Sequence, residues 1–158
     1  MAALVAERAV PYVCMHWRGH SADMQSRAAY DDVVTDVIGE LTLRLDVLAA
    51  AGVDLRRVAV DPGLGFAKNA DHNWQILRRL DDFAALGRPV LIGASRKTFL
   101  GRLLADEAGE LRPATARDDA STAITALAAA AGIWCIRVHA VPANLDAVKV
   151  ARRWTADD

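Results

Sequence analysis

The chain has 158 residues, of which 53% are apolar and 25% charged, a composition that supports one globular domain with a real core and excludes a disordered tail. Its 19 basic and 20 acidic residues give a formal net charge of -1, so overall charge does not point to nucleic acid or a membrane surface as a partner. Any anion site must therefore be local.

Cysteine usage and the N-terminal segment bear on the cellular compartment. Cys14 and Cys135 lie in apolar, strand-like runs, which is typical of buried thiols in a reducing compartment and not of a disulfide-built fold. The first residues lack a basic segment followed by a long apolar core, and no window approaches the roughly 18 apolar residues of a membrane span. The sequence predicts a cytoplasmic protein.

The N-terminal part predicts a helix, a buried strand and a long second helix. Residues 2–8 have helical spacing, and the apolar run 11–15 predicts a strand that ends at the polar segment 16–19. Residues 20–27 are loop-like. A helix closed by a glycine is predicted over residues 28–51, because apolar residues recur at helical spacing: Val33, Val34, Val37, Ile38, Leu41, Leu45 and Leu48.

The middle of the chain predicts two further strands. A strand at residues 57–60 opens into Asp61–Lys68, where a proline and two glycines exclude helix, and a helix follows over residues 71–80. A third strand, residues 90–92, runs into Gly93–Leu100. That junction presents a hydroxyl, a guanidinium and an ammonium at the start of a short helix, a combination suited to anions.

The C-terminal part continues the alternation. A polar loop at residues 106–113 precedes an alanine-rich helix over 114–131, a fourth strand over 133–139, and a last helix from Pro142. Strands therefore alternate with helices, and the strands are near-continuously apolar. This pattern predicts an α/β fold with parallel strands buried by helices.

Polar residues follow every predicted strand. In parallel α/β folds ligands bind beyond the carboxyl ends of the strands, and no strand shows a comparable set at its amino end. The sequence therefore predicts a ligand site at this rim, formed in chain order by His16 and Arg18, Asp61, Ser95 and Lys97, and Arg137 and His139.

The chemistry at this rim leaves alternatives open. A carboxylate at Asp61 could take paired hydrogen bonds from a 2-amino-pyrimidinone edge, or it could accept only turn amides. Lys97, Arg137 and His139 would give up to three positive charges for a polyphosphate leaving group. Arg137 and His139 could instead be a satisfied polar pair at a strand end.

Other candidates have competing structural roles. Lys68 and Arg96 are either site residues or solvated charges, and Phe66 and Trp17 are more often loop packing than ring-stacking platforms. Ser95 has no G-x-S-x-G context and no identifiable base, which excludes acyl-enzyme chemistry. No pair of histidines or cysteines stands at metal-ligand spacing.

Four motifs, in the same order, resemble dihydropteroate synthase of the actinobacterial type: MHWR (Met15–Arg18), DPGLGFAK (Asp61–Lys68), GASRKTFLG (Gly93–Gly101) and RVH (Arg137–His139). The resemblance covers nearly the whole chain. It implies a transferase on a (β/α)₈ barrel, a sulfonamide target, that joins 6-hydroxymethyl-7,8-dihydropterin diphosphate to 4-aminobenzoate. The products would be diphosphate and 7,8-dihydropteroate, for folate synthesis.

The resemblance implies roles position by position. Asp61 would bind the amino-pyrimidinone edge of the pterin, Lys97 would reach the pterin ring, and Arg137 would line the pterin and hold the diphosphate with His139. Thr98 would lie near the aminobenzoate carboxylate. Lys97, Arg137 and His139 would be the catalytic residues.

Five further positions are expected at the substrate pocket by the same resemblance. Met15 and Phe66 would be apolar walls, and Arg117 would approach the pterin from the preceding helix. Gly93 and Ser95 would belong to the binding loop.

The motifs of the family's first half, N-x-T-P-D-S-F, D-I-G-G-x-S/T-x-R-P-G and N-D-x-S-G, do not occur in this sequence. They supply the Mg²⁺ ligand, aminobenzoate contacts and part of the diphosphate site, so we expect Mg²⁺ as a cofactor whose ligand lies in that half. Ala140 stands where the family usually has aspartate, which leaves the orientation of His139 open. Met1 is expected to be an internal methionine of a longer reading frame or a chosen fragment start.

We therefore expect residues 1–158 to be a single partial pterin-binding domain, the C-terminal half of a TIM (β/α)₈ barrel with four parallel βα units and a preceding helix. A half barrel leaves two strand edges open, so the lone chain should be marginal, self-associating or completed by another segment, and inactive. The full-length enzyme would be a homodimer through its late helices. The alternatives are a pterin-binding methyltransferase-like domain and a non-catalytic degenerate or truncated module.

Overall fold

Four short parallel strands form the centre of the molecule, which the computed structural model describes over residues 1–19 and 24–156. The first two strands pair with each other, as do the last two. An isolated parallel bridge between Val60 and Val90 joins the two pairs, so the strands lie side by side in chain order, as in consecutive βα units. They are β1 (Tyr12–Met15), β2 (Val58–Asp61), β3 (Leu91–Ile92) and β4 (Cys135–Ile136).

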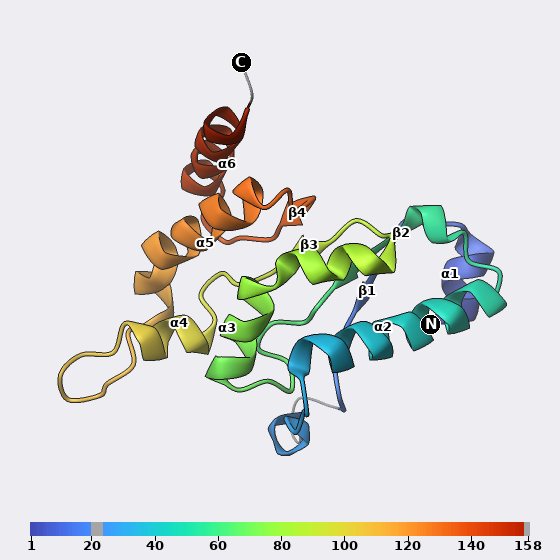
Figure 1. Ribbon diagram of the computed structural model, residues 1–158, viewed down its shortest axis with the longest axis horizontal. Coiled ribbons are helices and arrows are strands. Elements are labelled where there is room, and N and C mark those ends of the chain that lie inside the picture. The colour runs from blue at the N-terminus through green and yellow to red at the C-terminus, as the bar shows by residue number, and fades with distance from the viewer. Residues whose placement is uncertain (20–23, 157–158) are drawn as a thin grey trace.

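Helices connect these strands and pack against them. Among the described residues, none of the helices is both long and apolar enough to cross a membrane. The α-helices are α1 (Ala2–Arg8), α2 (Val33–Ala50), α3 (Ala70–Arg78), α4 (Thr98–Leu103), α5 (Asp118–Ala130) and α6 (Val141–Thr155), and the 3₁₀ helices are Met24–Arg27, Leu55–Arg57, Leu80–Leu86 and Ala114–Arg117. In Figure 1, α1 and α2 lie at one end of the molecule and α6 projects from the other.

Helix α2 is shorter at its start than the sequence predicts. It begins at Val33 and not at residue 28, because Asp32 is extended and its carboxylate accepts the Thr35 backbone N–H at 2.8 Å, an N-cap. Tyr30, before the cap, is held instead by a hydrogen bond from its hydroxyl to the Ala67 carbonyl at 2.9 Å. The predicted apolar stripe of α2 is buried except for Ile38, which is partly buried.

Four other predictions need correction. The α-helical part of the segment 114–131 begins at Asp118, after a 3₁₀ turn. The fourth strand is confined to Cys135–Ile136, because β3 supplies only a two-residue partner, and Cys135 is half-buried and not fully buried. Within the predicted loop 20–27, a 3₁₀ turn spans Met24–Arg27, and residues 20–23 lie outside the described residues.

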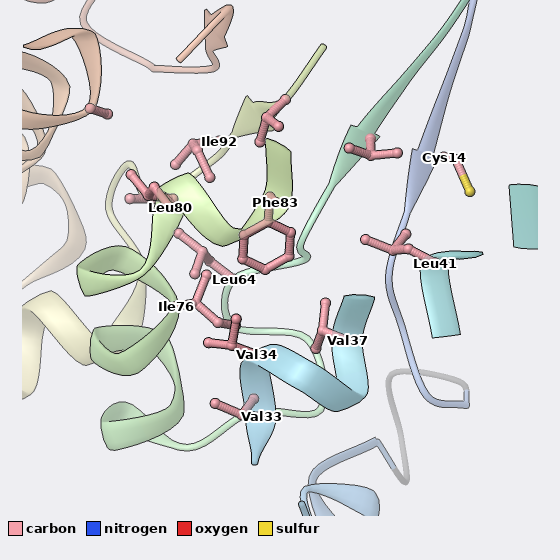
Figure 2. Packing of buried hydrophobic residues seen from close by; sticks show 14 of the residues in the cluster. Cys14, Val33, Val34, Val37, Leu41, Leu64, Ile76, Leu80, Phe83 and Ile92 are labelled. Carbon is pink, nitrogen blue, oxygen red and sulfur yellow. The ribbon is translucent and has the colours of Figure 1, made fainter. Parts of the chain in front are cut away.

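The core lies between the strands and the helices that cover them. Figure 2 shows side chains of α2, α3 and the loop after β2 converging on Phe83, which is fully buried. Removing so large a buried side chain by Phe83→Ala would cost about 3 to 5 kcal/mol. This packing gives the loops at the carboxyl ends of the strands a rigid support.

Candidate functional site

The backbone pairing of the strands brings three predicted site residues together. Met15 pairs with Asp61, and the His16 N–H donates to the Asp61 carbonyl at 2.8 Å. At the other pair, the Arg137 N–H donates to the Ile92 carbonyl at 2.8 Å. Asp61 and Arg137 consequently face the same rim, and the guanidinium nitrogen Nη2 of Arg137 lies 3.8 Å from Asp61 Oδ2.

Asp61 is the buried anion of this rim. Its side chain is only 4% exposed, and Oδ1 accepts the Gly63 backbone N–H at 2.8 Å. Burial raises the pKa of Asp61, while the Gly63 N–H and the charges of Arg137 and Lys97 act in the opposite direction. The turn-amide alternative thus accounts for one carboxylate oxygen, and the other oxygen is turned toward the cations.

Gly63 allows the end of β1 to contact the loop after β2. Its φ is +70°, and a Cβ atom there would lie 2.0 Å from the His16 carbonyl oxygen. Neither the conformation nor the space admits a side chain. Glycine at this position therefore fixes the loop that carries Asp61 against the neighbouring strand.

Lys97 lies beside Phe66 at the centre of the rim. Its Nζ is 4.2 Å from the centroid of the Phe66 ring, a cation–π contact. Burial lowers the pKa of Lys97, the charge of Arg137 lowers it further, and Asp61 opposes both. Phe66 is therefore a wall of the candidate site and not only loop packing.

A cavity of about 540 Å³ opens next to Lys97. Gly93, Ser95, Arg137 and His139 line it together with Lys97. A Cβ atom on Gly93 would lie 2.7 Å from Arg137 Nη2, so the absence of a side chain there makes room for the guanidinium. The cavity is thus lined by the cations that the sequence predicts for a polyphosphate.

Ser95 orients His139 in this cavity. Ser95 Oγ lies 2.9 Å from His139 Nδ1 and accepts the His139 backbone N–H at 3.3 Å. Oγ can donate its own proton to Nδ1, and in that tautomer the imidazole proton stays on Nε2. Ser95 therefore supplies the positioning partner for His139 that Ala140 cannot. This contact corrects the sequence-based expectation that no base lies near Ser95.

Arg96 and Arg117 have structural roles. The Arg96 guanidinium donates twice to Asp118, at 2.8 and 2.7 Å, and Arg96 has a φ of 60°. Arg117 donates from Nη1 to the Arg96 carbonyl at 2.8 Å and from Nε to the Arg112 carbonyl at 2.7 Å. The expected approach of Arg117 to the pterin pocket is not seen, because its guanidinium braces the loop, and Arg117 does not line the cavity.

A buried polar network lies beneath the loop after β2. Lys68, 3% exposed, places Nζ 2.9 Å from Nδ1 of the fully buried His16 and donates to the carbonyls of Gly63 at 3.2 Å and Phe66 at 3.1 Å. Nε2 of His16 lies 3.0 Å from Glu40. Lys68 is therefore not a solvated charge.

The environment sets the protonation of this network. Burial lowers the pKa of Lys68 to about 7. Burial and the charge of Lys68 lower the pKa of His16 to about 3, so the imidazole is neutral, donates from Nε2 to Glu40 and accepts from Lys68 at Nδ1. Sequence reasoning missed Glu40, although a carboxylate between the core residues Val37 and Leu41 of one helix was an available signal.

The remaining predicted site residues lie nearby. Thr98 is exposed at the start of α4 and lines a second cavity, of which Lys97 is also a wall. Met15 is half-buried at the end of β1, and its carbonyl accepts from Arg44 at 2.8 Å. Over residues 1–19 and 24–156, no group of three or more histidine, cysteine, aspartate or glutamate side chains could hold a metal ion.

Residues 1–139 match the family model described as pterin binding enzyme. The chain belongs to this family. It is 50% identical to the dihydropteroate synthase of Mycobacterium leprae over 155 residues, which are 98% of this chain and 55% of the relative. It is 39% identical to the dihydropteroate synthase of Streptococcus pyogenes over 95% of this chain and 52% of the relative. The chain thus spans about half the length of these curated relatives.

Solved structures of the family superimpose closely on the chain. A Yersinia pestis dihydropteroate synthase with a sulfonamide drug complex gives a TM-score of 0.90 at 32% identity, over 97% of this chain and 54% of that chain. The Thermus thermophilus dihydropteroate synthase in complex with 4-aminobenzoate gives 0.87 at 38% identity, over 97% and 57%. The predicted resemblance to this family is confirmed.

Proposed function

We propose that this chain is the pterin- and diphosphate-binding half of a dihydropteroate synthase. One observation carries the proposal: the buried Asp61, the half-buried Lys97 and the exposed Arg137 meet at the carboxyl ends of parallel strands beside a cavity lined by basic side chains. Solved relatives bind 4-aminobenzoate, 6HMPPP and 7,8-dihydropteroate. These are the two substrates and the product of the proposed reaction.

Asp61 would bind the pterin. Its carboxylate is desolvated, and only Oδ1 is engaged by a backbone N–H within the loop. Oδ2 and the second lone pair of Oδ1 can accept two parallel N–H donors from the amino-pyrimidinone edge, and such charge-assisted pairs are strong in a buried site. Lys97 and Phe66 would border the same ring.

Arg137 and His139 would stabilise the leaving group. The amine nitrogen of 4-aminobenzoate attacks the methylene carbon of the pterin diphosphate, a C–N bond forms as the C–O bond breaks, and diphosphate departs with the bonding electron pair. The amine then loses a proton to water. Arg137 and the Nε2–H of His139 would hold the growing negative charge, which is the part of the reaction that preorganised cations accelerate most.

The proposed architecture is half of a (β/α)₈ barrel with four parallel βα units and a preceding helix. The strand order and the coverage of about half of each solved relative support it. Mg²⁺ as the cofactor is also a proposal. The described residues offer no acidic or histidine cluster for it, so no step of the mechanism is assigned to a metal held by this chain.

We propose, further, that the full-length protein pairs through its late helices. Helices α5 and α6 pack together at one end of the molecule and leave large apolar side chains in solvent. Leu127 on α5 is 72% exposed and Trp154 on α6 is 86% exposed. Large apolar side chains exposed on these late helices are what supports an interface there.

Substitution of Asp61 tests the proposed function. Asp61→Asn replaces one acceptor by a donor and is expected to weaken pterin binding by about 2 to 5 kcal/mol, with the fold retained. Calorimetric titration with 6-hydroxymethylpterin measures the change, and Asp119→Asn, at an exposed acid on α5, is the matched control. Unchanged affinity of a folded Asp61→Asn variant would remove the role assigned to Asp61.

A further inference from the structure

Lys97 lines both the cavity beside Arg137 and His139 and a second cavity of about 450 Å³. The second cavity lies between the loop after β2, the start of α3, and α4. Its polar walls include Asn73 and Thr98. A single lysine therefore borders two adjacent spaces, which suits a reaction that joins two substrates.

Positive charge dominates the second cavity. Lys68, Lys97 and Arg102 line it, and no carboxylate does. The ammonium of Lys97, the guanidinium of Arg102 and the partly protonated Lys68 line one concave space without a carboxylate among its walls, which favours an anionic ligand. The ligand in this cavity should therefore carry a negative charge.

Only one of the three cations is unengaged. Lys68 donates to two carbonyls of its own loop and lies against His16, and Lys97 lies on the Phe66 ring. Over the described parts of the chain, the guanidinium of Arg102 has no hydrogen bond or ion pair. Arg102 is also exposed on α4, so the N–H groups of its guanidinium can donate hydrogen bonds to a ligand.

Arg102 and Thr98 share one face of α4. They are four residues apart in the same helix, and side chains at that spacing lie above one another on the surface. A carboxylate bound between them could accept the Thr98 hydroxyl proton and two parallel N–H groups of the guanidinium. This arrangement recognises a planar carboxylate and not merely negative charge.

We infer that Arg102 is a specificity-determining residue that binds the carboxylate of the arylamine substrate in the second cavity. The inference rests on the proposed function, because it is the synthase reaction that brings an arylamine acid to Lys97. It adds a residue on the second turn of α4 to the acid end of that site. The amine would then point from the second cavity past Lys97 toward the pterin methylene.

Binding of two matched arylamines tests the inference. Equilibrium dialysis would measure the affinity of the chain for 4-aminobenzoate and for uncharged 4-aminobenzamide, with 6-hydroxymethylpterin and diphosphate present. Arg102→Gln is expected to weaken the binding of 4-aminobenzoate about tenfold, because a hydrogen-bonded charge pair at an exposed site is lost. The affinity for 4-aminobenzamide should stay unchanged. Arg102→Lys should recover part of the preference, and Arg78→Gln, an exposed arginine on α3, is the control.

The two proposals fail in different ways. Equal affinities of the unsubstituted chain for the acid and the amide, no binding of 4-aminobenzoate, or an Arg102→Gln variant that keeps the preference would each overturn the role of Arg102. Titration with 6-hydroxymethylpterin alone reports the pterin site and the fold of each variant. If the unsubstituted chain does not bind 6-hydroxymethylpterin in this titration, the proposed function is overturned, whatever the arylamine result.

Discussion

Lys68 shows how strongly burial changes the chemistry of one side chain. Its ammonium lies among two loop carbonyls and His16, and it is nearly inaccessible to solvent. The cost of keeping a charge there is what lowers its pKa from 10.5 to about 7. The protonation state of Lys68 is therefore coupled to the stability of the loop that carries Asp61 and Phe66.

The depressed pKa predicts how stability depends on pH. Between about pH 7 and pH 10.5 the unfolded chain binds a proton at Lys68 that the folded chain does not, so this group makes the free energy of unfolding rise with pH across that window. Each unit of pKa difference corresponds to about 1.4 kcal/mol. Lys68→Met should remove this rise, as measured by urea unfolding at several pH values.

A matched lysine keeps that test specific. Lys149→Met changes the same charge at an exposed position of α6 and should leave the pH dependence as it is in the unsubstituted chain. Other titrating groups are common to all three proteins and cancel in the differences. If Lys68→Met and Lys149→Met show the same slope, Lys68 does not bind its proton differently in the folded and unfolded chains.

Among the elements, the loop Gly93–Lys97 and the segment that follows β4 form the proposed anion-binding part of the site. Ser95 holds His139, and Gly93 leaves space for Arg137. The loop is in turn fixed from behind by Arg96 on Asp118 and by Arg117. Ser95 and His139 are 44 residues apart in sequence, and their contact holds the two segments together as one rigid rim.

This rim predicts a specific response to anions. Phosphate should raise the melting temperature of the chain more than chloride at matched ionic strength, because a ligand that binds only the folded state stabilises it. Arg137→Ala should lose most of that difference, whereas Arg78→Ala should keep it. Thermal unfolding followed by circular dichroism measures the effect, and equal stabilisation by both salts would indicate screening without a site.

The sequence predicts the rim better than it predicts what lies behind it. Strand ends are visible because an apolar run stops at polar residues, and parallel topology then places those ends together, as happens for Asp61, Lys97 and Arg137. In the buried network, His16 is 52 residues from Lys68 and 24 residues from Glu40 in sequence. Only the packed fold brings them into contact, so local patterns could not distinguish a buried lysine from a solvated one.

Helix boundaries and arginine roles show the same limit. The apolar period of α2 is correct, but its start depends on the Asp32 cap and on the use of Tyr30 in a distant contact. Arg117 matches a motif position, yet its guanidinium is taken up by two loop carbonyls. Motif identity specifies a residue type, and the surrounding backbone decides what the side chain binds.

At the scale of the whole molecule, large apolar side chains on or beside two of the strands are incompletely covered. Val13 on β1 is 40% exposed and Trp134, next to β4, is 61% exposed. Within the described part of the chain, β1 and β4 each pair with one neighbour only. Open strand edges and exposed core side chains favour association with a further segment that completes the sheet.

The central claim is that this chain holds one half of a synthase site, and product formation tests it most directly. The purified chain, given 6-hydroxymethyl-7,8-dihydropterin diphosphate, 4-aminobenzoate and Mg²⁺, should make 7,8-dihydropteroate only at background rate, since catalysis requires both substrates to be positioned together. Mixing it with the separately produced first half of the Mycobacterium leprae synthase should give product, and Lys97→Ala should abolish that product. Formation of 7,8-dihydropteroate by the chain alone, abolished by Lys97→Ala, would contradict the account.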